Sequence, residues 1–323
     1  MRRWNQLDEV GGLDAGSVVT IGVFDGVHLG HAALIGRAVA TAIERSLPAV
    51  VMTFDPHPAA VFAPDRVPPL LTTPIRKAEL IAGLGVDALL SLSFTPAFAA
   101  LSPADFVDGV LHRALRARQV VVGPNFTFGH LAAGTVPDLE GLGAAAGFAV
   151  ESVGLVTAGA QRVSSTRIRG ALAIGDVESV AALQGRPYRA DGLVVNGQQR
   201  GRALGYPTAN LDLPPALAVP ADGVYAGRVV RLNRHGATVA APPLGVGAIS
   251  VGTNPTFAGQ VRTVEAFVLD FDGDLYGDHL GVEFCYRLRG QEKFDSLNAL
   301  VAQMDADVAR ARALVSREGR PGW

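Results

Sequence analysis

The chain has 323 residues, of which 49% are apolar and one is a cysteine, and it carries a formal net charge of −2. This length predicts about two domains with ample core, and the near-neutral net charge gives no electrostatic sign of nucleic-acid binding. No apolar run is long enough for a bilayer, the first residues lack the apolar segment of a signal peptide, and one cysteine excludes an internal disulfide framework. We therefore expect a cytoplasmic protein with neither membrane nor nucleic-acid partners, and self-association is left open.

The first half of the chain alternates apolar, strand-like segments with helix-like ones. Strands are predicted at Val18–Val23, Ala49–Phe54, Ala88–Phe94, Val120–Gly123 and Ala149–Val153. Helices are predicted at Ala32–Arg45, Ile75–Leu84, Pro103–Arg116, Leu139–Ala146 and Gly170–Gln184. Apolar strands joined by helical crossovers indicate an α/β domain with a parallel sheet covered on both faces, which we place at residues 1–184.

After Gln184 the pattern changes to short alternating strands separated by turns, which predicts an antiparallel β-barrel over residues 185–323. Its strands are predicted at Gly192–Val195, Gly223–Leu232, Gly247–Val251, Arg262–Phe271 and Gly281–Leu288. Cys285, in the last of these, is expected to pack rather than react. A final helix is predicted at Ser296–Arg317, with Ser296 as its N-cap. Its apolar face comprises Leu297, Leu300, Val301, Met304, Val308, Ala311, Leu314 and Val315.

The most informative motif is Gly22–His31, where two histidines among glycines separate a predicted strand from a predicted helix. A helix N-terminus offers unpaired N–H groups and partial positive charge to a phosphate, and glycines let the backbone approach it closely. His28 and His31 can then donate hydrogen bonds to a phosphate in its transition state. The motif indicates nucleotidyl transfer.

Two further segments of the first half bear on this chemistry. Lysine occurs only at positions 77 and 293, and neither follows the glycines of a P-loop, so arginine must supply phosphate-binding charge. The run Val163–Arg169 precedes a predicted helix, and Ser165 can cap that helix. Its three hydroxyls, Ser164, Ser165 and Thr166, followed by Arg167 and Arg169, can alternatively form a clamp for leaving pyrophosphate.

The second half holds two candidate features. Thr208 and Asn210 stand two apart, so on an extended segment their oxygens face the same side, and such oxygens together with ATP phosphates suit Mg²⁺. Glu265 interrupts an apolar strand; taken alone, such a carboxylate is more often a solvated strand residue than a catalytic base.

Four segments together resemble the prokaryotic bifunctional riboflavin kinases/FMN adenylyltransferases, also called FAD synthetases. They are Gly22–His31, Thr53–Pro58, Gly123–Gly129 and Ser164–Arg167, and the resemblance extends over essentially the whole chain. It implies that a Rossmann-like nucleotidyltransferase module joins AMP from ATP to FMN, giving FAD and pyrophosphate. It further implies that the barrel phosphorylates riboflavin to FMN.

The resemblance also implies site residues. ATP contacts of the first module are expected from Gly22, Phe24, His28, His31, Asn125, Ser164, Thr166 and Arg167, with His28, His31 and Arg167 catalytic. Flavin contacts are expected from Pro56, Pro58, Phe62 and Phe128. For the kinase, ATP contacts are expected from Gly201, Arg202, Gly205, Tyr206, Thr208 and Asn210, with Mg²⁺ at Thr208 and Asn210 and Glu265 as base.

Some details stay open at this stage. Tyr206 replaces the phenylalanine typical of the kinase motif, a change expected to have little consequence. His57 either shapes its loop or joins the site. Asn254–Phe257 and Leu275–Gly277 resemble loops around the kinase site. Two other classes of function are considered. One is an adenylyltransferase whose barrel binds flavin without catalysis. The other is a nucleotidyltransferase that acts on a different substrate, or an RNA-binding descendant of such an enzyme.

Overall fold

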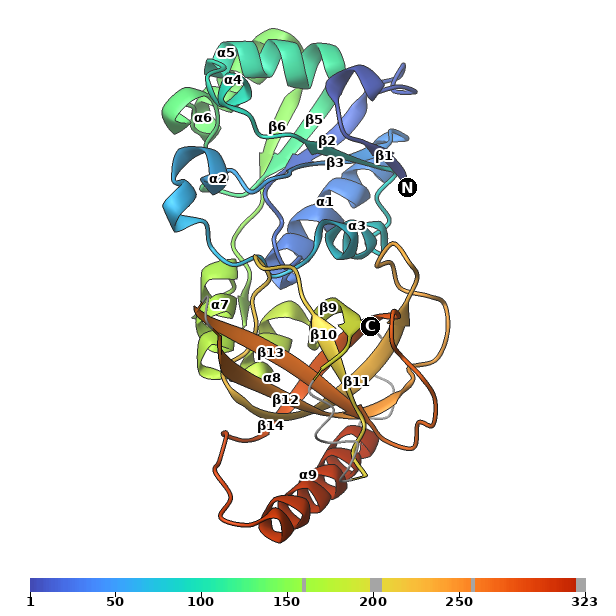
Figure 1. The fold of residues 1–323 in the computed structure, drawn as a ribbon. Helices are drawn as coiled ribbons and strands as arrows, with labels where there is room; N and C mark the ends of the chain where they lie inside the picture. Colours follow the sequence, from blue (N-terminus) through green and yellow to red (C-terminus); the bar gives the residue numbers. More distant parts are fainter. Residues whose placement is uncertain (159–160, 198–204, 257–258, 318–323) are drawn as a thin grey trace. The chain divides into compact units, whose positions relative to one another are not determined.

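The computed structural model describes residues 1–158, 161–197, 205–256 and 259–317. Contacts divide the chain into two compact units (Figure 1). The first unit comprises Met1–Pro68 and Lys77–Val163, and the second comprises Pro69–Arg76 and the described residues from Ser164 onward. The predicted boundary at 184/185 differs from this division, because residues 164–184 have more contacts within the second unit.

The first unit contains a parallel sheet, as predicted, and it has six strands in the order β1-β4-β3-β2-β5-β6. Its strands are β1 Arg2–Trp4, β2 Ser17–Ile21, β3 Ala49–Phe54, β4 Ala88–Leu92, β5 Ala117–Val122 and β6 Ala149–Ser152. The edge strand β1 was not predicted, because three residues are too short to show an apolar pattern. A small hairpin, β7 Thr157–Ala158 with β8 Gln161–Arg162, follows the sheet.

Helical layers cover both faces of this sheet. On one face Val19 and Met52 pack with Phe106 and Leu111, and on the other Val51 packs with residues of α1 and α3. Alternate strand residues therefore enter different cores, as the period of two requires. The helices are α1 Leu29–Arg45, α2 Ala59–Phe62, α3 Pro74–Ala82, α4 Pro96–Ala99, α5 Pro103–Asp105, a π-helix Phe106–Ala114 and α6 Val136–Ala146, with short 3-10 turns at Leu7–Glu9, Pro64–Arg66 and His130–Ala132.

The second unit is a closed six-stranded barrel in the order β10-β13-β12-β11-β14-β9, with every neighbouring pair antiparallel, which confirms the predicted architecture. Its strands are β9 Tyr188–Val195, β10 Thr208–Asp212, β11 Gly223–Leu232, β12 Gly245–Thr256, β13 Gly259–Val268 and β14 His279–Arg289. The segment that carries Thr208 and Asn210 is thus itself a barrel strand.

The single helix predicted at Gly170–Gln184 is wrong. The structure has two helices, α7 Ser165–Ile174 and α8 Val177–Gln184, because Gly175 adopts a left-handed φ of +77° that ends α7. Both helices pack within the barrel unit. The Ala221 N–H donates to the Leu172 carbonyl at 2.9 Å, and Arg287 Nη1 donates to the Ile174 carbonyl at 2.7 Å.

A segment from the first half of the chain also joins the second unit. Leu70 donates its N–H to the Ala216 carbonyl at 2.7 Å and accepts one from Ala218 at 2.8 Å. Arg169 Nε donates to the Pro69 carbonyl at 2.6 Å. No sequence pattern predicted this strap, because its pairing partner lies far along the chain.

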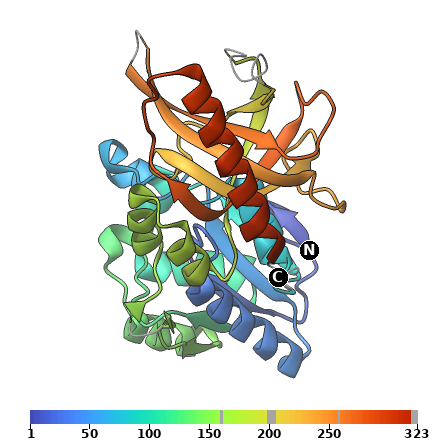
Figure 2. The same cartoon turned by 90° about the horizontal axis from the view of Figure 1, so that it is seen from below.

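The C-terminal helix α9 Leu297–Arg317 lies across the barrel strands (Figure 2). Ala311 and Val315 are buried against a cluster that includes Cys285, which is therefore a packing residue as predicted. The Ser296 hydroxyl accepts the Ala299 N–H at 3.2 Å, the expected cap. Leu297, however, is 61% exposed rather than part of the apolar face, because only the later turns of α9 have such buried partners.

Candidate active sites

In the first unit, the turn after β2 brings the two motif histidines into contact. His28 is the N-cap of α1, and its Nδ1 accepts the His31 N–H at 3.2 Å. The two imidazoles stack with ring centroids 3.5 Å apart. An Nδ1 that accepts a hydrogen bond carries no proton, so neutral His28 holds its proton on Nε2, where it can donate to a phosphate oxygen.

The backbone of this turn is strained and tightly packed. Phe24 and Val27 have left-handed φ values of +50° and +37°, which non-glycine residues rarely adopt. A Cβ on Gly22 would lie 2.9 Å from the Phe24 ring, and one on Gly30 would lie 3.2 Å from the His28 ring. Glycine at these positions therefore lets Phe24 and His28 fold back over the turn.

Asn125 follows β5 in the same unit. With its amide oriented so that the oxygen faces Arg162, it accepts from Nη2 at 3.0 Å and from Nη1 at 3.2 Å. Arg162 was not among the predicted site residues, because a single arginine in a short hairpin has no distinguishing pattern. Its guanidinium fixes the Asn125 side chain and adds a positive charge beside it.

A row of phenylalanine rings includes the predicted flavin contacts Phe62 and Phe128. Phe62 is 57% exposed and Phe128 is 6% exposed. Neighbouring ring centroids along the row lie between 5.2 and 6.1 Å apart. An aromatic surface of this kind suits the flat ring of a flavin. The row comprises Phe62, Phe94, Phe54, Phe98, Phe106, Phe128 and Phe126, five of which the sequence analysis did not assign.

The predicted flavin loop follows β3, with Pro58 at the start of α2. His57 Nδ1 accepts the Ala59 N–H at 3.1 Å, and its carbonyl accepts the Ala60 N–H at 2.8 Å. His57 therefore shapes this loop, which favours one of the two roles left open. Beside the loop, Lys77 is buried among backbone carbonyls, a placement the sequence analysis did not foresee.

Ser164, Thr166 and Arg167 begin α7 and belong to the second unit. Ser164, rather than Ser165, caps the helix, since its Oγ accepts the Arg167 N–H at 3.3 Å. Within the described part of the chain, the Nη1 of Arg167 is buried and has no hydrogen-bond partner. Such a guanidinium suits an anion. That these residues join His28 and His31 in one site stays a prediction.

In the second unit, the candidate kinase residues meet on neighbouring strands. Asn210 of β10 pairs with Glu265 of β13, and Thr208 Oγ1 donates to Glu265 Oε2 at 3.2 Å. Val264 and Ala266 are buried, so alternation turns the half-buried Glu265 toward the same side as Thr208 and Asn210. Residues 55 positions apart in sequence thus form one polar group.

Thr208 and Asn210 also line a cavity of about 420 Å³. Ala266 and the turn Phe271–Tyr276 form other walls, so Leu275 and Tyr276 of the predicted loop lie at this site. Gly205 has a left-handed φ of +86°, and Gly201 and Arg202 lie outside the described residues. Among the residues that the structure describes, no group of three or more His, Cys, Asp or Glu is arranged to hold a metal ion.

Tyr206 makes two contacts. Its ring lies edge-on to Phe267, with centroids 5.2 Å apart, and its hydroxyl donates to the Asp305 carboxylate on α9. This hydrogen bond raises the pKa of Tyr206. A phenylalanine at position 206 would keep the ring contact with Phe267 but lose the hydrogen bond to α9. The tyrosine therefore adds a contact that the typical phenylalanine cannot make.

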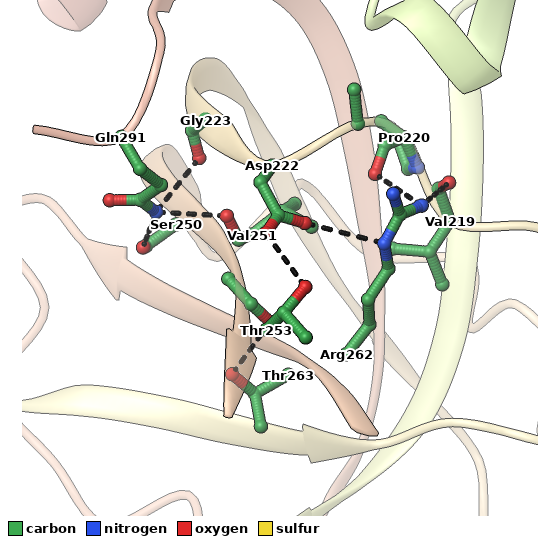
Figure 3. Close-up of polar contacts among 12 residues, drawn as sticks. Val219, Pro220, Asp222, Gly223, Ser250, Val251, Thr253, Arg262, Thr263 and Gln291 are labelled. Atoms are coloured by element: carbon green, nitrogen blue, oxygen red, sulfur yellow. Dashed lines mark hydrogen bonds and ion pairs between the residues drawn. The ribbon is translucent and has the colours of Figure 1, made fainter. Parts of the chain in front are cut away.

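A polar network links the inner part of β12 and β13 to Asp222, just before β11, and to Gln291, just after β14 (Figure 3). Arg262 Nε pairs with Asp222 Oδ1 at 3.3 Å, and Thr253 Oγ1 donates to Asp222 Oδ2 at 2.7 Å. Gln291 donates to the Val251 carbonyl at 2.8 Å and to Ser250 Oγ at 3.0 Å. The network fixes the strands that lead to Asn254–Phe257, whose side chains lie outside the described part.

Comparisons with known proteins assign a family to each half of the chain. The family described as FAD synthetase matches residues 12–167, and the family described as riboflavin kinase matches residues 184–315. A bifunctional riboflavin kinase/FMN adenylyltransferase of Pseudomonas fluorescens is 40% identical, covering 93% of this chain and 94% of its own. Its counterpart in Listeria monocytogenes is 37% identical, covering 94% of each chain.

A crystal structure from Streptococcus pneumoniae, titled a macrolide-efflux protein, superposes with a TM-score of 0.85 at 34% identity, covering 96% of this chain and 98% of that one. In the described ranges of the present chain, no helix has the length and apolarity to cross a membrane. Both matched families and both relatives are named as flavin enzymes, and their matches together extend over nearly the whole chain. The chain therefore belongs to the family of bifunctional riboflavin kinases/FMN adenylyltransferases.

Proposed function

We propose that the two transferase activities of this family use separate residue sets in this chain. The barrel unit phosphorylates riboflavin with ATP to give FMN and ADP. The sheet unit then transfers AMP from ATP to FMN, giving FAD and pyrophosphate. The observation that carries the proposal is the hydrogen bond between Thr208 and Glu265 beside a cavity. It places Thr208, the residue expected to lie near the ATP phosphates, next to a carboxylate that can act as a base.

In the kinase reaction, the nucleophile is a neutral primary hydroxyl that must lose its proton. Glu265 accepts that proton as the hydroxyl oxygen bonds to the γ-phosphorus, and the bond to ADP breaks. The Thr208 hydroxyl donates to the carboxylate and holds it in position. Asn210, paired with Glu265 across the strands, faces the same group.

Mg²⁺ fits the residues of this site. The Thr208 hydroxyl and the Asn210 amide supply hard, neutral oxygens at the wall of the cavity, the ligand type that Mg²⁺ accepts together with water and ATP phosphates. When bound, the ion neutralises phosphate charge during transfer. In our proposal Thr208 and Asn210 hold it.

In the adenylyl transfer, the nucleophile is the FMN phosphate, which is already ionised at neutral pH. One of its oxygens bonds to the α-phosphorus of ATP, and the bond to pyrophosphate breaks, so no strong base is required. What the step needs is alignment and charge neutralisation. His28 and His31 donate to phosphate oxygens, and Arg167 with Ser164 and Thr166 receives the leaving pyrophosphate.

The flavin ring of FMN is assigned to the phenylalanine row, with the exposed Phe62 at one end, the buried Phe128 further along, and Pro56 and Pro58 in the loop next to Phe62. We further propose that the two functional modules divide at 184/185 and that the protein acts in the cytoplasm. The sequence has a single cysteine, the buried Cys285, so no internal disulfide can form, which suits a reducing compartment.

The test is to incubate the full chain with riboflavin, ATP and Mg²⁺ and to follow FMN, FAD and ADP separately over time. We expect FMN with ADP first and FAD later, and FAD directly when FMN is supplied. FAD formation from FMN without ADP release from riboflavin would support the alternative of a non-catalytic barrel. Absence of FAD with supplied FMN would favour another nucleotidyl acceptor.

A further inference from the structure

Lys77, in α3, is a buried lysine of the first unit, 9% exposed. The other lysine of the sequence, Lys293, is exposed. Removing an ammonium group from water is costly unless hydrogen bonds and opposite charges replace the solvent. A lysine kept in such a place must therefore have compensating partners, and the mechanism proposed above does not use it.

Three acceptors surround the ammonium group. Lys77 Nζ donates to the carbonyl of Val23, to Thr53 Oγ1 and to the carbonyl of Phe54, each at 3.3 Å. An ammonium has three N–H donors, so the protein uses all of them. The Thr53 hydroxyl in turn donates to the Val23 carbonyl at 2.9 Å, which closes the network. Nζ thus joins the residues that follow β2 to the end of β3.

Two carboxylates act on the same group. Burial lowers the pKa of Lys77, whereas Asp25 and Asp55 oppose that shift. Asp25 is 4% exposed and lies in the nucleotide turn Gly22–His31, and Asp55 lies in the flavin loop Thr53–Pro58. The ammonium therefore offsets negative charge in both segments, next to where anionic substrates must bind.

We propose that Lys77 is a positioning residue for adenylyl transfer, because its ammonium fixes the spacing between the nucleotide turn and the flavin loop. The inference rests on the proposed function, in which an FMN phosphate oxygen attacks the α-phosphorus of ATP and pyrophosphate leaves. Lys77 gives and takes no proton in that step. Its donors are occupied by the protein, so it acts through Val23, Thr53 and Phe54.

A lysine suits this position better than an arginine. The ammonium is compact and directs three donors tetrahedrally, so one atom can reach acceptors on two strand ends. A guanidinium is planar and larger, and its fork suits a carboxylate or phosphate instead. This geometry explains why a lysine occupies position 77 in a sequence that has only one other lysine.

The experiment compares Lys77→Met, Lys77→Gln and Lys293→Met in the full chain, with FAD formation from FMN and ATP measured against FMN formation from riboflavin. For Lys77→Met we expect kcat of FAD formation to fall about 10- to 100-fold, since small misalignments of reacting groups are costly in rate. Lys77→Gln, which keeps donors without the charge, should lie between Met and the parent. FMN formation should stay at the parent rate in all three variants.

Ile81→Val, a substitution of a fully buried residue one turn further along α3, separates positioning from simple loss of packing. It should lower the melting temperature of the protein without changing kcat of FAD formation. A folded Lys77→Met protein with the kcat and KM of the parent overturns the proposal. A parent protein that makes no FAD from FMN would instead refute the proposed function, before any variant is compared.

A second measurement needs no folded Lys77 variant. With ¹³C-labelled lysine the parent gives two side-chain signals, and Lys293→Met assigns them. The Lys77 signal should titrate below the ordinary lysine pKa of 10.5 and should shift when FMN saturates the protein, whereas the Lys293 signal should not respond to FMN. A Lys77 signal that FMN leaves unmoved contradicts a link between this ammonium and the flavin loop.

Discussion

In the proposed mechanism, the two units use different residue types for different chemical problems. In the sheet unit the proposed groups are donors, His28 and His31, whose rings stack at the start of α1. The barrel unit presents an acceptor, the Glu265 carboxylate, held by Thr208. The difference follows from the nucleophile, because an FMN phosphate arrives ionised and a riboflavin hydroxyl does not. Donors suffice for the first reaction, and a base is required for the second.

The two sites also differ in where the fold places them. In the sheet unit, the nucleotide turn and the flavin loop follow neighbouring parallel strands, and both therefore lie at one edge of the sheet. In the barrel unit, the polar group lies across antiparallel neighbours, so Asn210 meets Glu265 by strand register. The first arrangement keeps motifs contiguous in sequence, and the second disperses them.

The largest effect expected is from Glu265→Gln, which removes the proton acceptor and keeps the shape. Riboflavin phosphorylation should fall by about a hundredfold or more, with little change in riboflavin binding, because general-base help contributes about 10²–10⁴ in rate. FAD formation from supplied FMN should persist. Steady-state assays of both reactions check this. Near-parent FMN production by the folded variant would show that Glu265 is not the base, and that the two units do not differ in this way.

The reciprocal change is in the nucleotide turn. His31→Ala and His28→Asn should each lower FAD formation about a hundredfold, since one transition-state donor contributes on the order of 3 kcal/mol. Asparagine is itself a good N-cap residue, so His28→Asn tests the imidazole without removing the cap of α1. Riboflavin phosphorylation is the internal control. Equal loss of both activities in a folded variant would mean that the units are not independent.

A third prediction concerns how separable the units are. A fragment that begins near Arg186 should fold and phosphorylate riboflavin, and one that begins at Ser164 should unfold at a higher temperature. The longer fragment retains α8, whose Val177 and Val180 are fully buried, and burial of such side chains contributes about 1.5–3 kcal/mol each. Thermal unfolding of both fragments measures the difference. Equal melting temperatures would assign α7 and α8 to the first unit instead.

The smallest expected effect is from Tyr206→Phe. Loss of the hydrogen bond to Asp305 should change the KM for ATP in riboflavin phosphorylation by about two- to tenfold, as expected for a bond contributing about 0.5–1.5 kcal/mol. Asp305→Asn is the matched control, because it weakens the same link from the side of α9. If neither variant differs from the parent, the tyrosine is as neutral as the sequence analysis expected.

The amino-acid sequence by itself determined the architecture. Apolar strands with helical crossovers predicted the parallel sheet, and short alternating strands predicted the barrel, because both signals are local periodicities that persist over several residues. The motif Gly22–His31 could also be found from the sequence, because its residues are contiguous, and its contact with a nucleotide stays a prediction. The edge strand Arg2–Trp4 and the break at Gly175 were missed, since each depends on a few residues whose neighbours decide their conformation.

Only the tertiary structure decided the contacts between segments distant in sequence. Strand register brings Glu265 to Thr208 and Asn210, and α3 brings Lys77 to Val23 and Phe54. Packing likewise joins the strap at Leu70 to the barrel and assembles the phenylalanine row. These hydrogen bonds and ring contacts join residues on different helices and strands, so they form only once those elements have packed together. Local periodicity carries no information about those meetings.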